Sequence, residues 1–509
     1  MKKVVSLILA LCLVLSIVSF ASAEGTTTIR VYRNQYLNVD EGQVKKVQDA
    51  INARLAELGS NVAVEIHEFM DSEYGDKANN ALIGKEVDLL WTANWYATIG
   101  TNELYAAKGA YDLTDLLPGT LLWDSMPAWY WEAARYDGKD YYVPVYKEGA
   151  EGYMVKILDV NAEKAGIDLA AMVADIEGQE NTYARLKALE PYMDQALDAG
   201  VKYPFIFAGT PMFYRFYLDK YDFIDNGLNS AIGVDQASNT MINTIQTEDY
   251  LNYCKMIAEW GEKEYISVDD EIGGVVTSAT NQTQDWMINW WTAVPNNAES
   301  IGRDNQEAET FAKVTENWGR STTTLGSCFA VSAAVSEDVA KACVEFLGYL
   351  FTDTEVADLY TYGIEGEDYV LVDGKIDFNA DGIPKLYHHD AWCSTSVKPL
   401  TLNVTEPDNK VAMYDDFNNA ASGTVASGFR PNKSVTILDD DGKEISLEAI
   451  YTACTGIFEE YGKSLELGAY GSAAVEAKIG EYQNALNKAG YEKLLAEYQR
   501  QYEEWKAAQ

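Results

Sequence analysis

The chain has 509 residues, which is long enough for two or three domains with a large buried core. Its formal charge of −40 at pH 7 repels nucleic acid and anionic lipid, so we expect neither as a partner. The 34 Tyr and 12 Trp outnumber the 15 Phe, and aromatic rings with a polar group suit surfaces that bind carbohydrate, because a pyranose has an apolar face and a rim of hydroxyls.

The first 23 residues have the pattern of a signal peptide. Lys2 and Lys3 precede an apolar run over residues 4–20, and the small residues 21–23 follow as a cleavage site. Leu11 and further apolar residues flank Cys12, so we expect no lipid anchor there. We therefore expect cleavage near Ala23, an extracytoplasmic protein that is secreted or periplasmic, and no transmembrane helix.

Strands and helices alternate in the first part of the mature chain. The residue pattern predicts strands over 29–33, 62–67 and 87–91, and helices over 44–58 and 73–83. This order is typical of an α/β lobe, in which ligands bind beyond the carboxyl ends of the strands. The candidate binding residues after the third strand are Asn94, Trp95 and Tyr96.

The residue pattern over 136–147 predicts a strand that a proline interrupts. Asp137 and Gly138 suit a tight turn, and alternating aromatic and β-branched residues follow. Pro144 cannot donate a ladder hydrogen bond, so the strand lies at a sheet edge or leaves its sheet there. We interpret this segment as a crossing between two lobes and Tyr146 as a candidate ligand contact. An ordinary edge strand with exposed tyrosines explains the stretch equally well.

A second α/β-like region follows, and two of its segments are rich in aromatic residues. Residues 212–217 are aromatic around Arg215, a candidate hydrogen-bond donor to a ligand. Trp286, Trp290 and Trp291 lie within six residues of one another, which is more indole than a core usually holds in one place. A carbohydrate-stacking role for at least one of them and simple packing are equally supported.

The later part of the chain carries motifs of a known family. A predicted strand over 325–332 precedes a helix that Ser336 can cap. The motifs are Gly363-Ile364-Glu365-Gly366 with Tyr369, Phe417-Asn418-Asn419-Ala420, Ser427-Gly428-Phe429, and the closing Ala489-Gly490-Tyr491 to Trp505. With these motifs the chain resembles family 1 extracellular solute-binding proteins of carbohydrate ABC importers, in the subgroup with a long C-terminal region.

The resemblance implies an α/β, two-lobe periplasmic-binding-protein-like (type II) fold with hinge crossings. It places the N-terminal lobe at residues 24–144 plus 325–352, and the C-terminal lobe at 145–324 plus 353–509. It further implies a solute, an oligosaccharide by the aromatic bias, held between the lobes, with ABC permease subunits as partners and Glu365 as a candidate ligand contact. A non-enzymatic receptor follows, without catalytic residues or cofactor.

The C-terminal end predicts two amphipathic helices separated near Gly490. Apolar residues recur at spacings of three and four on either side of it, so each helix buries one stripe. We expect both helices to pack on the second lobe as a helical extension. The pattern is too short for a stable coiled coil, so we expect a monomer.

Metal and hydrolase chemistry are less well supported. Residues 377–382 imitate the start of a calcium loop, but His388 stands where the loop requires a bidentate Glu. His388 and His389 are adjacent and point apart in an extended segment, so we predict no metal site; Trp392 nearby is a candidate ligand contact. Acidic pairs are too common to identify a glycosidase. A secreted carbohydrate-active enzyme and a receptor that presents its ligand to a sensor kinase remain the alternatives.

Overall fold

The computed structural model describes residues 25–36, 39–224, 228, 230–277, 280, 283–295, 308–380, 382–438 and 441–508. The expected signal peptide lies outside these residues. Contacts between residues divide the chain into two units. Unit 1 comprises Met1–Trp131, Tyr136–Val145 and Ser327–Thr401, and unit 2 comprises Glu132–Arg135, Tyr146–Gly326 and Leu402–Gln509.

Unit 1 is built on a five-stranded sheet with the order β2-β1-β3-β14-β4. β1 pairs in parallel with β2 and β3, whereas β14 pairs antiparallel with β3 and β4. The strands are β1 (Thr27–Gln35), β2 (Val62–Met70), β3 (Leu89–Thr92), β14 (Cys328–Val331) and β4 (Tyr142–Pro144). The predicted α/β succession in this part of the chain is confirmed, with β3 beginning two residues later than expected.

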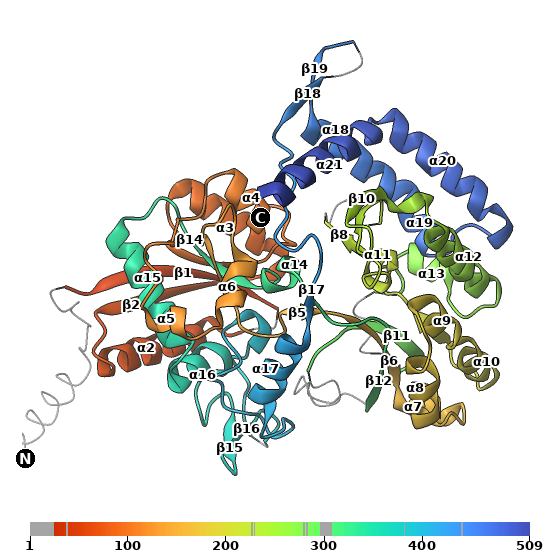
Figure 1. Cartoon of the computed structure of the whole chain (residues 1–509). Coiled ribbons are helices and arrows are strands. Elements are labelled where there is room, and N and C mark those ends of the chain that lie inside the picture. The colour runs from red at the N-terminus through yellow and green to blue at the C-terminus, as the bar shows by residue number, and fades with distance from the viewer. Residues whose placement is uncertain are drawn as a thin grey trace, which may run out of the picture. The chain divides into compact units, whose positions relative to one another are not determined.

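Helices cover both faces of this sheet. The chain moves from β1 to β2 in one direction and from β2 to β3 in the other, so right-handed crossovers place α2 and α3 on opposite faces, as Figure 1 shows. Asp40 caps α2 by accepting a hydrogen bond from Gln43 N, and Ser336 caps α15 as predicted. The helices are α2 (Glu41–Glu57), α3 (Asp71–Gly84), α4 (Thr101–Ala106), α5 (Leu121–Asp124), α6 (Ala128–Ala134, which ends in unit 2), α15 (Glu337–Leu350) and α16 (Thr354–Tyr362). A hairpin of β15 (Val370–Val372) and β16 (Lys375–Asp377) follows.

The interrupted strand is the edge strand β4, which ends at Pro144. Tyr142, Val143 and Pro144 pair with β14, so both segments predicted as crossings are neighbours in one sheet. The chain then enters unit 2 after Val145 and returns to unit 1 at Ser327. Pro144 is the last residue of β4, although Val145 N still donates to Ser327 O at 3.0 Å before the chain leaves the unit.

Unit 2 contains a four-stranded sheet with the order β12-β6-β11-β7 and two three-stranded sheets, β10-β9-β8 and β17-β13-β5. The strands of the first sheet are β12 (Glu309–Lys313), β6 (Tyr153–Leu158), β11 (Trp286–Thr292) and β7 (Tyr203–Ile206). The others are β8 (Tyr221–Phe223), β9 (Ile232–Asp235), β10 (Thr240–Asn243), β5 (Ala150–Glu151), β13 (Trp318–Gly319) and β17 (Ser422–Gly423). Like the sheet of unit 1, this four-stranded sheet mixes parallel and antiparallel pairs.

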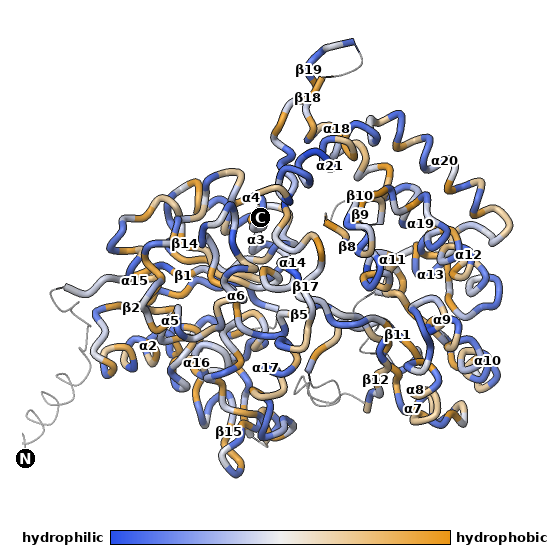
Figure 2. Tube along the Cα trace, viewed as in Figure 1, coloured by the Kyte–Doolittle hydropathy of each residue, from blue (hydrophilic) through white to orange (hydrophobic). Residues whose placement is uncertain are grey.

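Most helices of unit 2 pack around one hydrophobic core that includes the C-terminal helices. The α-helices of unit 2 are α7 (Asp159–Lys164), α8 (Leu169–Glu177), α9 (Thr182–Lys187), α10 (Glu190–Asp198), α11 (Phe213–Phe216), α12 (Glu248–Glu262), α13 (Val268–Ile272), α14 (Ser321–Thr324), α17 (Lys410–Ala420), α18 (Leu447–Ile457), α19 (Lys463–Glu466), α20 (Val475–Lys488) and α21 (Tyr491–Ala508). Polar and apolar residues alternate along α20 in Figure 2, and Tyr482, Leu486, Tyr491 and Tyr498 are buried. The two predicted C-terminal helices and their packing on the second unit are therefore confirmed. A hairpin of β18 (Thr436–Leu438) and β19 (Glu444–Ser446) precedes α18.

One expected lobe boundary is corrected. Residues 353–401 belong to unit 1, whereas the resemblance implies the second lobe for them. The reason is a set of polar contacts to the first sheet and its helices: Arg33 donates to Tyr360 O and Ser394 Oγ, and Gln43 donates to Asp368. These contacts are made by side chains and leave no periodic pattern in the sequence.

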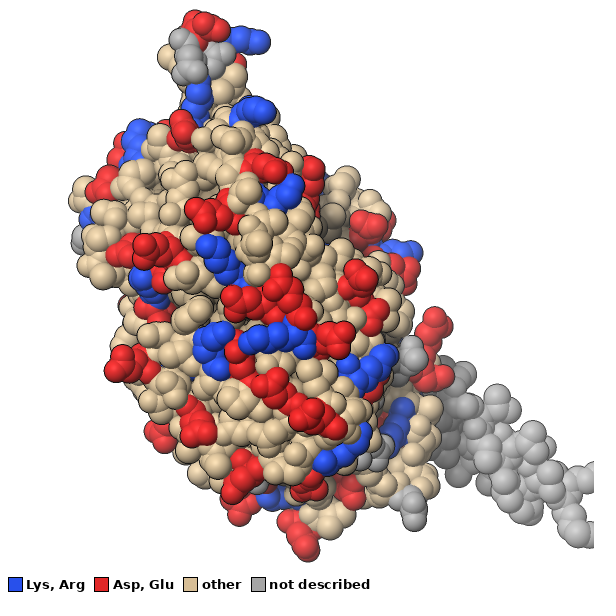
Figure 3. Space-filling view, turned by 90° about the vertical axis from the view of Figure 1, so that its right-hand side faces the viewer, with Lys and Arg blue, Asp and Glu red and all other residues tan. Residues whose placement is uncertain are grey.

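Among the described residues, no helix is long and apolar enough to cross a membrane. On the face drawn in Figure 3, acidic and basic side chains lie interspersed.

Candidate functional site

An aromatic cluster lies at the carboxyl end of β3 in unit 1. The buried indole of Trp91, in β3, makes edge contacts with Trp95 and Tyr96, with ring centres 5.9 and 5.7 Å apart. Trp95 stacks on Tyr96 at 4.6 Å, and Trp392 lies 5.9 Å from Trp91 and 6.4 Å from Trp95. The structure thus brings together three of the predicted site residues, Trp95, Tyr96 and Trp392.

Hydrogen bonds from Trp91 and Tyr96 fix the position of this cluster. Trp91 Nε1 donates to Ser327 Oγ at 2.9 Å, and the Tyr96 hydroxyl donates to the carboxylate of Asp71. Burial, together with the hydrogen bond to Asp71, raises the pKa of Tyr96, so its hydroxyl stays protonated at neutral pH. Trp95 is 47% exposed although its neighbours are held rigidly. An exposed indole on a fixed support can stack against the apolar face of a pyranose.

Sequence reasoning missed one member of this cluster, Tyr36. Its ring lies 5.3 Å from Trp392 and 6.3 Å from Trp91. Tyr36 directly follows β1, just as Asn94 closely follows β3, so the rule that ligands bind beyond the carboxyl ends of parallel strands could have found it. Asn94 lies in the loop between Trp91 and Trp95 and is half-buried.

A second cluster in unit 2 surrounds Arg215, which lies in α11. The guanidinium carbon is 4.2 Å from the ring centre of Tyr214 and 4.9 Å from that of Trp290. Trp290 Nε1 donates to the carbonyl oxygen of Phe207 at 2.9 Å, and Arg215 Nη1 donates to that of Pro211 at 3.1 Å. Both Arg215 and Trp290 are half-buried, so this cluster pairs a partly accessible indole with a cation.

The charge of Arg215 is stabilised by its surroundings. Burial opposes the charged form, but the nearby Tyr214, Tyr153 and Glu151 outweigh it and raise the pKa of Arg215. Glu151 in turn accepts from Arg320 Nη1 at 2.8 Å and from the Tyr153 hydroxyl at 2.6 Å. Arg215 therefore remains a cation that can donate hydrogen bonds to ligand hydroxyls or carboxylates.

For one of the other two tryptophans in β11, Trp286, the expected ligand contact is corrected. Trp286 is 0% exposed and packs in a small core with Leu158 and Ile206, so it cannot stack on a solute. Trp291 is half-buried, and its ring centre lies 3.9 Å from Lys156 Nζ. Consecutive strand residues point to opposite faces, which separates Trp291 from the cluster of Trp290.

Tyr146 lies in unit 2 and Glu365 in unit 1. Tyr146 is 1% exposed, and its hydroxyl donates to Asp415 in α17, so the structure gives this ring a packing contact where a ligand contact was expected. Glu365 lies in an exposed turn before β15, where its backbone bridges to that of Tyr369. The neighbouring Glu367 pairs with Lys46 of α2, and Asp368 accepts a hydrogen bond from Gln43 of the same helix, so this turn lies against α2.

Two α/β units and a chain that passes between them more than once agree with the expected two-lobe organisation. The N-glycan transport solute-binding protein NgtS from Streptococcus pneumoniae has a similar structure, with a TM-score of 0.74 and 21% identity, covering 94% of this chain and 99% of that protein. FusA, an ABC-transporter substrate-binding protein of S. pneumoniae solved with kestose, matches with a TM-score of 0.53 and 13% identity, covering 95% of this chain and 100% of FusA. The expected α/β solute-binding-protein fold is therefore confirmed.

Sequence comparison agrees with the structural comparison. A protein of S. pneumoniae serotype 4, described as a carbohydrate ABC transporter substrate-binding protein, is 23% identical over 484 residues, covering 91% of this chain and 90% of the relative. Residues 445–507 match a domain of unknown function (DUF3502). The similarity to this relative agrees with the resemblance to solute-binding proteins of carbohydrate ABC importers that the sequence motifs indicate.

Proposed function

We propose that the protein is the extracytoplasmic substrate-binding component of an ABC importer and binds an oligosaccharide. The observation that carries this proposal is the exposed Trp95, stacked on Tyr96 and supported by buried Trp91 at the end of β3. An exposed indole costs free energy in water, and a fixed one offers a ligand a flat apolar surface. The protein acts without catalysis, as a monomer that delivers its ligand to permease subunits.

The second cluster, around Arg215 in unit 2, supports a saccharide ligand in particular. Trp290 offers an indole and Arg215 a cationic donor, the combination that a sugar ring with its hydroxyl rim requires. Asn94 adds an amide beside Trp95. The relatives support the same class of ligand, since NgtS has been solved with Man1GlcNAc and Man5GlcNAc.

The expected location follows from the proposed role. A receptor for an importer works outside the cytoplasm, which agrees with the predicted signal peptide of residues 1–23. Edman sequencing of the secreted protein should give Glu24 as the first residue. A chain that begins at Met1 in the culture medium or periplasm would contradict the expected cleavage.

Calorimetric titration with four oligosaccharides tests the proposal: Man5GlcNAc, kestose, maltotetraose and cellotetraose. We expect at least one to bind, and its constituent monosaccharides to bind at least about tenfold more weakly, because each further stacked ring contributes roughly 1 kcal/mol or more. Tight binding of another class of solute, with no binding of any saccharide, would contradict the proposal.

Two further measurements separate the alternatives. Prolonged incubation with the fluorescently labelled oligosaccharides should release no product; product release would show that the protein is a carbohydrate-active enzyme. Copurification with permease subunits supports the importer, whereas copurification with a sensor kinase supports the ligand-presenting receptor.

A further inference from the structure

The segment that carries Arg215 is held by two buried carboxylates from other parts of unit 2. Residues 207–216 follow β7, receive the Trp290 Nε1 hydrogen bond at Phe207 and include α11. Glu271 of α13 accepts hydrogen bonds from Phe207 N and Gly209 N, both at 2.6 Å. Between them the backbone turns sharply, with φ of +54° at Ala208.

The second carboxylate comes from the C-terminal region. Glu466, at the end of α19, is 0% exposed and accepts a hydrogen bond from Phe213 N at 3.0 Å, at the start of α11. Arg215 lies two residues further on, and its own N–H donates to Met212 O at 3.1 Å. Glu466 therefore fixes the backbone of the turn from which the Arg215 side chain projects toward Trp290.

A buried carboxyl at position 466 costs folding free energy, which indicates that its polar contacts have a role. Transfer of a carboxylate from water to a protein interior is opposed by a large desolvation penalty, and an apolar side chain of similar size would fill the same space without it. Glu466 lies within residues 445–507, the part of the chain that matches the domain of unknown function, and this part packs against the core of unit 2. Its placement points to a role in the site of Arg215.

We propose that Glu466 is a positioning residue for the saccharide surface of unit 2, and that the C-terminal region of residues 445–507 supports this surface by fixing Arg215 from behind. The inference rests on the proposed function, because Arg215 matters as a ligand contact only if the protein binds a saccharide. Glu271 holds the other end of the same segment.

The titratable groups that face Glu466 come from several elements. Burial raises the pKa of Glu466 to about 7, although Ser230, Tyr250, the backbone at Phe213 and Arg215 favour its charged form. Tyr253, Tyr482 and Cys254 also interact electrostatically with Glu466. Burial raises the pKa of each of these three groups, so they stay protonated near neutral pH. In the range from pH 5 to 9, Glu466 is thus the group of this set that changes its charge.

The test compares Glu466→Met, which fills the space without an acceptor, with Glu466→Gln, which keeps an acceptor oxygen. Each is combined with Arg215→Ala, and affinity is measured at pH 8 for the tightest-binding of the four oligosaccharides. We expect Glu466→Met to weaken binding about threefold to tenfold and Glu466→Gln less than about twofold. In the Arg215→Ala background Glu466→Met should have no further effect. An equal loss in both backgrounds would overturn the inference, as would full affinity in Glu466→Met.

Hydrogen exchange without ligand tests the structural part of the inference, that Glu466 fixes the segment, separately from the proposed function. Peptides that cover residues 207–217 should exchange about tenfold faster in Glu466→Met than in Glu466→Gln, while peptides of α20 stay unchanged. Glu497→Gln, which alters an acid paired with Arg500 within α21, serves as the control from the same region. Unchanged exchange at 207–217 overturns the inference. If none of the saccharides binds the wild type, the proposed function fails, and the exchange result alone decides whether Glu466 fixes the segment.

Discussion

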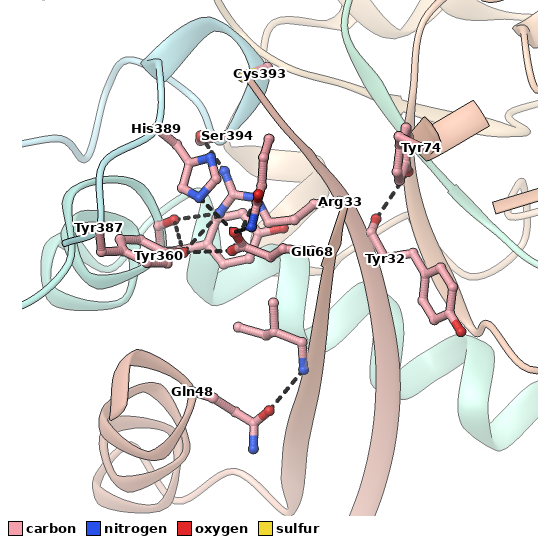
Figure 4. Close-up of polar contacts among 12 residues, drawn as sticks. Tyr32, Arg33, Gln48, Glu68, Tyr74, Tyr360, Tyr387, His389, Cys393 and Ser394 are labelled. Carbon is pink, nitrogen blue, oxygen red and sulfur yellow. Dashed lines mark hydrogen bonds and ion pairs between the residues drawn. The ribbon is translucent and has the colours of Figure 1, made fainter. Parts of the chain in front are cut away.

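Glu68→Ala is expected to lower the free energy of unfolding of unit 1 by about 3–5 kcal/mol, because it leaves a buried cation without its partner. Figure 4 shows Glu68 of β2 beside Arg33 of β1 and His389. The carboxylate of Glu68 lies 3.0 Å from His389 Nε2 and accepts from the Tyr387 hydroxyl at 3.2 Å. Arg33, 1% exposed, lies 3.9 Å away through its Nε.

The same network ties a distant segment to the sheet. Arg33 donates to Tyr360 O at 2.6 Å and to Ser394 Oγ at 2.8 Å, and its guanidinium carbon lies 4.0 Å from the ring centre of Tyr360. His389 and Ser394 flank Trp392, so the network also fixes the position of a predicted ligand contact. Loss of Glu68 should therefore loosen the segment that carries Trp392 as well as destabilise the fold.

Urea denaturation followed by circular dichroism measures the effect. The matched control is Glu65→Gln in the same strand, where the side chain is 52% exposed and pairs with His67 at 3.1 Å; it should change stability by less than about 0.5 kcal/mol. A Glu68→Ala variant as stable as this control would show that the buried pair contributes little.

The pH dependence of stability provides a second readout for Glu68. Burial opposes its charge, but His389, Arg33 and Gln35 outweigh burial and lower the pKa of Glu68 below its usual value. A carboxyl with a lowered pKa in the folded state contributes stability that is present above its unfolded pKa and lost as pH falls through the folded pKa. Between about pH 4.5 and pH 2, wild type should lose stability that Glu68→Ala lacks from the start.

Regular periodicity explains which parts of the fold could be predicted from the sequence. β1, α2 and β2 follow from apolar spacings of two and of three to four, and the edge position of β4 follows from Pro144. Residues 353–401 were assigned to the wrong unit because Arg33, Gln43 and Glu68 attach them through side chains, and a single buried arginine has no periodic signature.

The candidate site, too, could be predicted only in part from the sequence. The loop after β3 could be predicted, because strand ends position ligands in α/β sheets whatever the tertiary details. The three tryptophans of β11 could not be separated by sequence: packing takes Trp286 into the core, while Trp290 meets Arg215. Tyr146 was a reasonable candidate at a crossing, but α17, more than 260 residues later in the chain, supplies Asp415 to its hydroxyl.

Trp95→Ala is expected to weaken oligosaccharide binding about tenfold to thirtyfold, and Trp290→Ala by a similar factor. Removing a stacked indole loses its buried apolar area and its ring contact, together about 1.5–2 kcal/mol. Because Trp95 is 47% exposed, its truncation leaves no large cavity, so stability should change by less than about 1 kcal/mol. Calorimetry gives the affinity and thermal unfolding gives the stability.

Trp286→Phe is the matched control, since it alters an indole in the same strand that is 0% exposed. This variant should lose about 1–2 kcal/mol of stability and keep its affinity within about twofold, because Phe leaves a small gap in the core while Trp290 stays in place. The opposite pattern, full affinity in Trp95→Ala and Trp290→Ala with weakened binding in Trp286→Phe, would contradict the assignment of both surfaces. If only Trp95→Ala weakens binding, the saccharide contacts are limited to unit 1. The lost indole area at the end of β3 then accounts for the weaker binding.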